Sequence, residues 1–329
     1  LAGDIGGTKT RLALFTAAGE RLESCVEETF PSREHGGLDE IVRAFVSQQQ
    51  VSVTHAGFGV AGPVKHSRSE TTNLPWVVDA RQLAGQLGIA SVVLINDLEA
   101  NAYGVAALEA KDFVILSHGA PDAEGNAAII AAGTGLGEAG LYWDGAQHHP
   151  FACEGGHTDF APRNELEIEL LRYLLTRFTR VSYERVLSGP GLYNIYQFLR
   201  DTGRGKEPVW LTEELHEQDP AATISQAALT DRSALCVQAL DLFVSLYGAE
   251  AGNLALKVMA TGGLYVGGGI APKILQKLQD STFVQAFLTK GRMQPLLEAM
   301  PVRVILNDKT ALLGAARCAL LRAVRTKDA

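Results

Sequence analysis

Two glycine-containing turns in the sequence carry side chains that suit phosphate binding. The first, Gly6-Gly7-Thr8, separates an apolar segment that contains Asp4 from the apolar run 11–15. Glycine lets a phosphate approach backbone N–H donors, and a threonine hydroxyl adds another donor. The Asp4 carboxylate can hold Mg²⁺ through a water molecule. Any β-hairpin turn can contain glycine, but this combination favours a phosphate-binding turn.

The second turn lies after the apolar run 127–132 and contains Thr134 and Gly135. Residues 135–140 match the GxGxxG pattern of dinucleotide-binding enzymes, which requires a helix directly after the turn. Residues 141–143 indicate a returning strand instead, so we favour a second phosphate-binding hairpin. The sequence has no GxxxxGK[ST] motif, which argues against a P-loop enzyme.

A third glycine run, Gly267-Gly268-Gly269, lies between an expected strand and an expected helix. Such a run can serve simply as a packing turn. It also leaves bare backbone at Gly268 and Gly269, against which a flat adenine or ribose can lie. We interpret it as the border of a nucleotide site.

Asn96 and Asp97 directly follow a short apolar strand expected at 92–95. A carboxylate at a strand end, beside a cleft, is well placed to accept a proton from a substrate. Either residue could also cap the helix expected at 98–110. The two roles are compatible, because the cap requires only one of the side chains.

A second polar cluster is expected around the glycine-rich loop 154–159. It contains Glu154 and His157, and Glu184 follows just before the motif 188–191. Carboxylate and imidazole groups form good hydrogen bonds with the vicinal hydroxyls of a sugar. The cluster therefore indicates a site for a polyol.

A zinc site at this loop is disfavoured, because Cys153 is the only thiol near His157 in the sequence. Asn73 adds a further amide to the sugar candidates. Trp76 offers an aromatic ring for the sugar face, although an isolated ring of this kind also packs readily in a hydrophobic core.

The expected elements alternate between strands and helices, which is typical of an α/β protein. The two hairpins indicate mixed sheets and two related halves. The stretch 202–230, with its glycines and prolines, is predicted to be a linker. Expected strands are 53–60, 92–95, 113–116, 127–132, 258–266 and 302–306, and expected helices are 37–50, 79–88, 98–110, 164–178, 190–201, 231–258, 272–279 and 309–325.

The length of 329 residues suggests about two domains. A formal net charge of −8 argues against partners such as nucleic acid or an anionic membrane. No uninterrupted apolar run reaches the roughly 18–20 residues that a membrane span requires. The chain begins at Leu1 inside an expected strand, so we expect a few residues to precede it.

Four cysteines, Cys25, Cys153, Cys236 and Cys318, lie far apart and form no CxxC pair. An even number would allow two disulfides. The sequence shows no signal-peptide pattern, so we expect reduced thiols in a cytoplasmic protein.

Together these segments resemble the bacterial glucokinase family, which belongs to the superfamily of actin, the Hsp70 ATPase domain and hexokinase. The run 154–162 is the most specific match, whereas 4–8 alone would indicate only the superfamily. The related repressor/kinase group has a cysteine-rich zinc motif that this chain lacks, so the chain looks like the non-zinc branch. The matching segments are 4–8, 95–97, 132–137, 154–162, 184–191 and 268–272, in family order.

The resemblance implies a role for each candidate residue. Asp97 would be the general base on the 6-hydroxyl of glucose. Glucose would be bound by Asn96, Glu154, His157, Glu184 and Asn73. ATP and Mg²⁺ would be bound by Asp4, Gly6, Gly7, Thr8, Thr134, Gly135, Gly268 and Gly269, with Asp4 holding Mg²⁺ through water.

The resemblance also implies an α/β, two-domain, actin-like ATPase (ribonuclease H-like) fold with mixed sheets and an interdomain cleft. We expect a small domain of 1–107 plus 305–329 and a large domain of 108–304. Closure of the cleft would exclude water from the reaction. A homodimer and a role in glycolysis are implied by the resemblance alone.

Three alternatives stay open at this stage. One is a non-catalytic sugar sensor of the same fold, although such regulators usually add a basic DNA-binding domain for which this chain lacks length and charge. The others are a kinase for another hexose and an NAD-dependent enzyme that uses 135–140. An assay of ATP and NAD binding separates the last alternative from a kinase.

Overall fold

The computed structural model describes residues 1–18, 21–71 and 74–325. The chain divides into two compact units. The first, called the terminal unit below, comprises residues 1–110, 149–152 and 307–329. The second, called the central unit, comprises residues 111–148 and 153–306.

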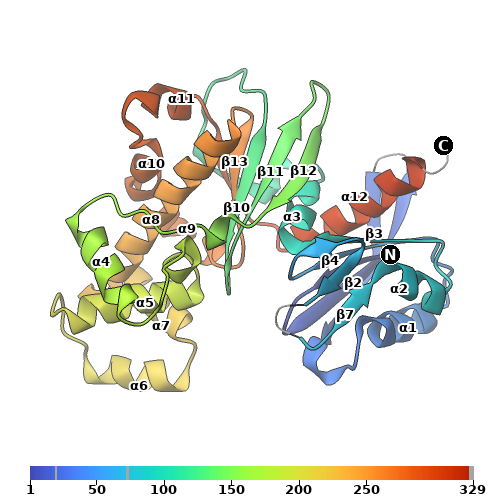
Figure 1. Ribbon diagram of the computed structural model, residues 1–329, viewed down its shortest axis with the longest axis horizontal. Helices are drawn as coiled ribbons and strands as arrows, with labels where there is room; N and C mark the ends of the chain where they lie inside the picture. The colour runs from blue at the N-terminus through green and yellow to red at the C-terminus, as the bar shows by residue number, and fades with distance from the viewer. Residues whose placement is uncertain (19–20, 72–73, 326–329) are drawn as a thin grey trace. The chain divides into compact units, whose positions relative to one another are not determined.

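The terminal unit contains a five-stranded mixed sheet of order β3-β2-β1-β4-β8 (Figure 1). Strands β1 and β2 form the predicted antiparallel hairpin, and β4 and β8 continue the sheet in parallel. Parallel strands end at the same edge, so the first glycine turn follows β1 at the edge where β8 ends at Asn96. The strands are β1 (Ala2–Ile5), β2 (Lys9–Ala18), β3 (Arg21–Pro31), β4 (His55–Val60) and β8 (Ser91–Asn96).

Helices cover both faces of this sheet because successive strand residues point to opposite faces. Phe58 on β4 belongs to the core that includes Phe45 of α1 (Leu38–Gln49). At its neighbour Gly57, a Cβ would overlap the carbonyl of Ala315 on α12 (Thr310–Arg325). The missing side chain therefore lets the last helix lie directly on the sheet.

The helix that follows β8, α3 (Asp97–Val105), crosses α12 at very short range. A Cβ at Gly314 would overlap the carbonyl of Ala100, and a Cβ at Gly104 would overlap the carbonyl of Thr310. This close packing fixes the start of α3, where Asp97 lies. The unit also contains α2 (Ala80–Leu87), which matches the helix predicted at 79–88. A small sheet that was not predicted is formed by β5 (Val64–Lys65), β6 (Arg68–Glu70) and β7 (Val77–Asp79).

A second mixed sheet, of order β12-β11-β10-β13-β14-β9, forms the base of the central unit. Strands β10 and β11 are the predicted second hairpin. Because a strand follows residues 133–135, the dinucleotide-binding interpretation of 135–140 is wrong. The strands are β9 (Phe113–Ser117), β10 (Ala127–Ala132), β11 (Leu136–Trp143), β12 (His148–Cys153), β13 (Gly263–Gly267) and β14 (Val302–Ile305).

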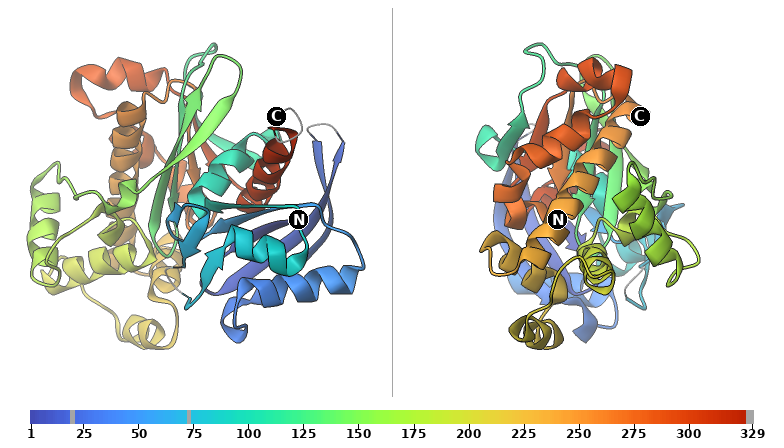
Figure 2. Two further views of the ribbon diagram at one scale, coloured as in Figure 1. Left: turned by 45° about the vertical axis from the view of Figure 1, so that its right-hand side comes forward. Right: turned by 90° about the vertical axis from the view of Figure 1, so that its left-hand side faces the viewer.

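Helix α8 (Ala234–Val258) lies along one face of this sheet (Figure 2). Three further helices pack against α8: α5 (Gly189–Asp201), α7 (Pro220–Leu229) and α10 (Ser281–Leu288). Among the described helices, α8 is the one that length and composition alone would allow to cross a membrane. In the structure, 72% of its most apolar stretch is buried, as expected of a core helix.

The predicted linker 202–230 is wrong, because most of it is helical. Pro208 precedes α6 (Val209–Glu217), and Pro220 is the first residue of α7 (Pro220–Leu229). Proline is well tolerated in a first helical turn, where its missing N–H is not needed. The Asp219 side chain caps α7 by accepting a hydrogen bond from Ala222 N–H at 2.8 Å.

The predicted strand 258–266 begins only at Gly263, because α8 continues to Val258 and ends at Met259 with φ of 54°. The remaining helices of the central unit are α4 (Glu165–Leu175), α5 (Gly189–Asp201), α9 (Leu275–Leu278), α10 (Ser281–Leu288) and α11 (Gln294–Glu298). Its 3₁₀ turns include η3 (Gly155–His157), η4 (Tyr183–Arg185) and η5 (Ala271–Ile274).

Candidate active-site residues in the two units

The turn Gly6-Gly7-Thr8 connects β1 and β2 and is held in place by Ser32. The Ser32 hydroxyl donates to Gly6 O at 2.8 Å, and its N–H donates to Thr8 O at 3.0 Å. Ser32 is fully buried, and its hydroxyl also lies 2.9 Å from that of Thr10. Thr8 itself is exposed. Thr8 is therefore accessible to solvent, while the carbonyl oxygens of Gly6 and Thr8 accept hydrogen bonds from Ser32.

Asp4 lies on β1, opposite Arg11 on β2. Burial raises the pKa of Asp4, and the positive charge of Arg11 opposes that rise. Arg11 is shared, because it also donates to Asp308 at 3.1 Å. A carboxylate that burial destabilises gains from an additional cation nearby. One carboxylate beside a phosphate-binding turn is also a typical protein contribution to an Mg²⁺ site.

Asn96 and Asp97 lie at the junction of β8 and α3, and the side chains of both accept from Leu98 N–H, Asp97 through Oδ1 at 3.0 Å. Asn96 is the N-cap: its Oδ1 accepts from Leu98 N–H at 2.9 Å, and its Nδ2 donates to Gly62 O at 3.1 Å. Asp97 is the first helical residue, and its carbonyl accepts from Asn101 Nδ2 at 3.0 Å. Its backbone position is thus fixed from both sides, and its side chain is partly exposed.

Glu154 directly precedes the short turn η3 in the central unit, and His157 is the last residue of that turn. The distance from His157 Nε2 to Glu154 Oε2 is 4.0 Å, and the two side chains are 56% and 63% exposed. Both glycines between them are needed. A Cβ at Gly156 would overlap Leu136 O, and a Cβ at Gly155 would overlap the carboxyl of Glu138. The loop therefore lies directly on β11, with its two polar side chains accessible.

The segment after this loop pairs with the segment that precedes Glu184. Phe160 N–H donates to Val181 O at 3.0 Å, and Tyr183 N–H donates to Thr158 O at 3.0 Å. This pairing places η4 beside η3. The pairing brings Glu184 to the same region as Glu154 and His157, although Glu184 lies 27 positions after His157 in the sequence.

The Glu184 carboxylate lies at the turn of the β10–β11 hairpin. Its Oε2 accepts from Leu136 N–H at 3.1 Å, and a Cβ at Gly135 would lie 2.5 Å from the same oxygen. Gly189 N–H donates to Gly133 O at 2.8 Å, which ties the start of α5 to this turn. A predicted sugar ligand and a predicted phosphate-binding turn are therefore in direct contact within one unit.

Gly268 and Gly269 follow β13, beside the end of β10. Gly268 has φ of +83°, and a Cβ there would overlap the backbone of Ala132. Ile270 N–H donates to Ala132 O at 3.2 Å. Both glycines are exposed. The bare backbone at 268–269 thus lies next to the strand that leads into Thr134.

Tyr247, which the sequence analysis missed, supports this region from α8. It is fully buried, its hydroxyl accepts from Ala132 N–H at 3.1 Å, and the same oxygen lies 3.3 Å from both Ile130 O and Gly267 O. The hydroxyl therefore joins β10 and β13 just before their glycine turns. A tyrosine in an apolar helix gives no sequence signal that distinguishes such a bond from ordinary core packing.

Replacing Tyr247 with phenylalanine should destabilise the central unit. The change removes the Tyr247 acceptor of the buried Ala132 N–H, which costs about 1–3 kcal/mol of unfolding free energy. Urea unfolding measures the effect. An unchanged free energy of unfolding would contradict this role of the hydroxyl.

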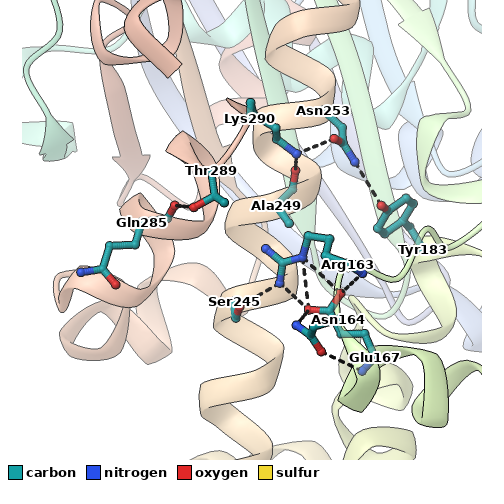
Figure 3. Close-up of polar contacts among 10 residues, drawn as sticks. All are labelled: Arg163, Asn164, Glu167, Tyr183, Ser245, Ala249, Asn253, Gln285, Thr289 and Lys290. Carbon is teal, nitrogen blue, oxygen red and sulfur yellow. Dashed lines mark hydrogen bonds and ion pairs between the residues drawn. The ribbon is translucent and has the colours of Figure 1, made fainter. Parts of the chain in front are cut away.

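An ion pair anchors the end of the 154–164 segment to α4 and α8 (Figure 3). Glu167 is fully buried, and Arg163 donates to it through its N–H at 2.7 Å and through Nη2 at 2.5 Å. Asn164 Nδ2 donates to the same carboxylate at 3.1 Å, and Arg163 Nη2 also donates to Ser245 Oγ at 2.9 Å. The loop is thereby tied to the long core helix.

Arg163→Met should destabilise the protein, because it leaves the Glu167 carboxylate buried without its cation. Breaking a fully buried pair costs about 3–5 kcal/mol, and because Arg163 is itself partly exposed we expect about 2–4 kcal/mol. The control is Arg172→Met on α4, because Arg172 and its partner Glu165 are both largely exposed. That change should lower the free energy of unfolding by about 0–1 kcal/mol. If denaturant unfolding shows equal losses of stability for the two variants, the buried pair has no special role.

Among the described residues, no group of three or more His, Cys, Asp or Glu side chains could hold a metal ion. None of the four cysteines, all of which lie in the described part of the chain, forms a disulfide; Cys25 is exposed, Cys153 is partly buried, and Cys236 and Cys318 are buried. Asn73, predicted as a sugar ligand, lies outside the described residues.

Comparison with known proteins shows the family to which the chain belongs. A family model described as Glucokinase matches residues 1–322. The chain belongs to the glucokinase family. It is 46% identical to the glucokinase of Nostoc punctiforme over 334 residues, which covers 97% of this chain and 98% of that one.

Glucokinase crystal structures show the same fold. The glucokinase of an Antarctic psychrotroph aligns with a TM-score of 0.85 at 32% identity, over 97% of this chain and 98% of that chain. A ROK family glucokinase from Streptomyces griseus, solved with glucose and AMPPNP, aligns with a TM-score of 0.64 at 22% identity, over 97% and 98% of the two chains. The predicted actin-like ATPase fold with mixed sheets is confirmed.

Proposed function

We propose that this chain transfers the γ-phosphoryl group of ATP to the 6-hydroxyl of glucose, giving glucose 6-phosphate. The observation that carries the proposal is the contact between Glu184 and the hairpin turn at Gly135 and Leu136. It joins a polar cluster suited to sugar hydroxyls to a turn suited to phosphates. Relatives named glucokinase, and a ROK family neighbour solved with glucose and AMPPNP, support the same chemistry.

In this proposal Glu154, His157 and Glu184 bind glucose hydroxyls. Carboxylates accept hydrogen bonds from hydroxyls, and imidazole can both donate and accept. The exposure of Glu154 and His157 leaves these groups accessible to a ligand. Asn96 and Asn73 complete the proposed sugar ligands. Asn96 Oδ1 already binds Leu98 N–H at the start of α3 and its Nδ2 binds Gly62 O, so its contribution is the smaller one.

Asp97 is the proposed general base. It would accept the proton of the 6-hydroxyl as the new O–P bond forms. The transition state of phosphoryl transfer is loose, so the proton leaves late and a strong base is not required. The packing of α3 against α12 holds the residue at a fixed position, which serves this role.

ATP would be bound by the turns 6–8 and 133–135 through backbone N–H groups, Thr8 and Thr134, with Gly268 and Gly269 bordering the nucleotide. Asp4 would hold Mg²⁺ through water. When bound, the ion neutralises charge on the transferred phosphoryl group. The partial burial of Asp4 beside a single shared arginine fits this assignment. A homodimer, a cytoplasmic location and a role in glycolysis also belong to the proposal.

A coupled assay with ATP and a panel of hexoses tests the proposal. Glucose should give the highest kcat/KM, and NAD should not bind. Mannose and galactose differ from glucose at one hydroxyl each, so they report on individual ligands of the sugar site. Turnover of a different hexose at least tenfold better than glucose would overturn the assignment of the substrate. No turnover with any hexose would favour a sugar sensor.

A further inference from the structure

Glu138 is a buried carboxyl group directly beneath the glycine-rich loop. It lies on β11, opposite Ile130, and is 1% exposed. Its carboxyl is so close to Gly155 that a Cβ at that position would overlap it. Among the residues that the structure describes, Glu138 Oε1 has no hydrogen-bond partner. A charged group in this position would be strongly destabilised.

The other side of Glu138 faces α8, where Glu250 is also fully buried. Both oxygens of Glu250 are occupied: Lys257 Nζ lies 3.2 Å from Oε1, and Asn253 Nδ2 donates to Oε2 at 2.7 Å. Glu250 therefore has hydrogen-bond and ion-pair partners of its own. A negative charge at Glu138 would be buried as well, and Glu138 Oε1 has no hydrogen-bond partner among the described residues.

Burial and then the charge of Glu250 raise the pKa of Glu138 to about 8, while Lys257 opposes the rise. The neutral acid is therefore favoured below that pH and the anion above it. Other groups that face it are Tyr247 on α8 and Cys153 and Glu154 beside the loop; burial and the charge of Glu138 both raise the pKa of Cys153.

The same cluster extends to the segment of Glu184 (Figure 3). Asn253 Nδ2 lies 3.0 Å from the hydroxyl of Tyr183, the residue directly before Glu184. Lys290 Nζ donates to Asn253 Oδ1 at 2.5 Å. A polar cluster on α8 and β11 thus contacts both segments that carry the proposed glucose ligands.

We propose that Glu138 is a positioning residue for glucose binding: its neutral, buried carboxyl supports Gly155 and thereby sets the positions of Glu154 and His157. The inference rests on the proposed function of those two residues as glucose ligands. Ionisation of Glu138 places a second charge beside Glu250 and beneath the loop. The loop is then displaced, and glucose binds less well.

The test compares the wild type with Glu138→Gln and Glu138→Leu at saturating ATP, between pH 6.5 and 9.5. In the wild type we expect the KM for glucose to rise above pH 8, by up to about tenfold at pH 9 if the anionic form does not bind glucose. Glutamine has the shape of the neutral acid, so Glu138→Gln should bind glucose as the wild type does at pH 7 and lack the alkaline rise. Glu138→Leu should have a raised KM at every pH, with a smaller effect on kcat.

Lys290 requires a control, because desolvation and the charge of Arg163 lower its pKa to about 8 as well. Lys290→Met should retain the alkaline rise in the KM for glucose. The proposal is overturned if Glu138→Gln shows the same rise as the wild type, or if Lys290→Met abolishes it. The proposal is also overturned if the KM for glucose of the wild type does not change between pH 6.5 and 9.5.

The failure of the glucose-site assignment would be distinguishable. If Glu154→Gln leaves the KM for glucose unchanged at pH 7, the loop is not the sugar site and the proposed function of Glu154 fails. If Glu154→Gln raises that KM while Glu138→Gln and Glu138→Leu behave as the wild type at every pH, only the role of Glu138 fails. Thermal unfolding of Glu138→Leu shows whether the variant is folded, and Glu138→Gln decides the question if it is not.

Discussion

Asp97→Ala should reduce kcat by about 10²- to 10⁴-fold, the usual contribution of a general base. The 6-hydroxyl of glucose is a poor nucleophile until its proton leaves, and in our proposal Asp97 is the acceptor. The fold should survive, because Leu98 N–H loses its bond to Asp97 Oδ1 but keeps its bond to Asn96 Oδ1, which caps α3. We expect only a small change in the KM for glucose, from one lost hydrogen bond.

The matched control is Asn96→Ala, which removes the cap at the adjacent position. It should lower the free energy of unfolding by about 1 kcal/mol, with a loss of kcat far smaller than that of Asp97→Ala. Steady-state kinetics and denaturant unfolding separate the two outcomes. If Asp97→Ala keeps more than about a tenth of normal kcat while folded, the base assignment is wrong. Glu154 would then be the next residue to test.

The hairpins and their turns could be predicted because their signals are local. An apolar strand, a glycine turn and a returning strand occupy fewer than 20 consecutive residues, as in 127–143. The returning strand was also enough to reject the dinucleotide pattern at 135–140. Over a stretch of this length the local sequence controls the backbone conformation, so the hairpin can be predicted from its own residues.

The supports of these turns could not be predicted, because they come from distant parts of the chain. Ser32 binds the first turn from the connection that follows β3, and Tyr247 reaches Ala132 across 115 residues of sequence. Glu138 is hidden for another reason. Its place in the GxGxxG match gives no sign of burial, yet Glu138 is only 1% exposed. Periodicity does not indicate which face of a hairpin is covered.

The error at 202–230 has a similar origin. Pro208 and Pro220 were interpreted as breaks in regular structure, whereas each lies at the start of a helix. Proline terminates a helix from its interior but is compatible with its first turn. The Asp219-Pro220 pair is in fact an N-terminal helix signal, and in hindsight it could have been recognised.

Glu154→Gln should raise the KM for glucose roughly 10- to 100-fold while changing the KM for ATP much less. A carboxylate binds hydroxyls more strongly than a neutral amide does, and hydrogen bonds to charged groups contribute about 1.5–3 kcal/mol. Because 63% of the Glu154 side chain is exposed, the change should leave the stability of the protein unaltered. The loss then reflects binding alone.

Asp159→Asn is the matched control for this prediction, since it makes the same chemical change in the same loop. Asp159 is 76% exposed and pairs with Arg180 at 2.7 Å. Arg180 also donates to His157 O at 2.8 Å, and this bond to the loop backbone does not involve the Asp159 side chain. Exposed pairs contribute little, so we expect less than about a twofold change in either KM. If both variants raise the KM for glucose equally, glucose binding depends on the net charge of the loop rather than on a contact with Glu154. An equal loss of ATP and glucose affinity in Glu154→Gln would mean that Glu154 maintains the loop, and the direct glucose contact would be excluded.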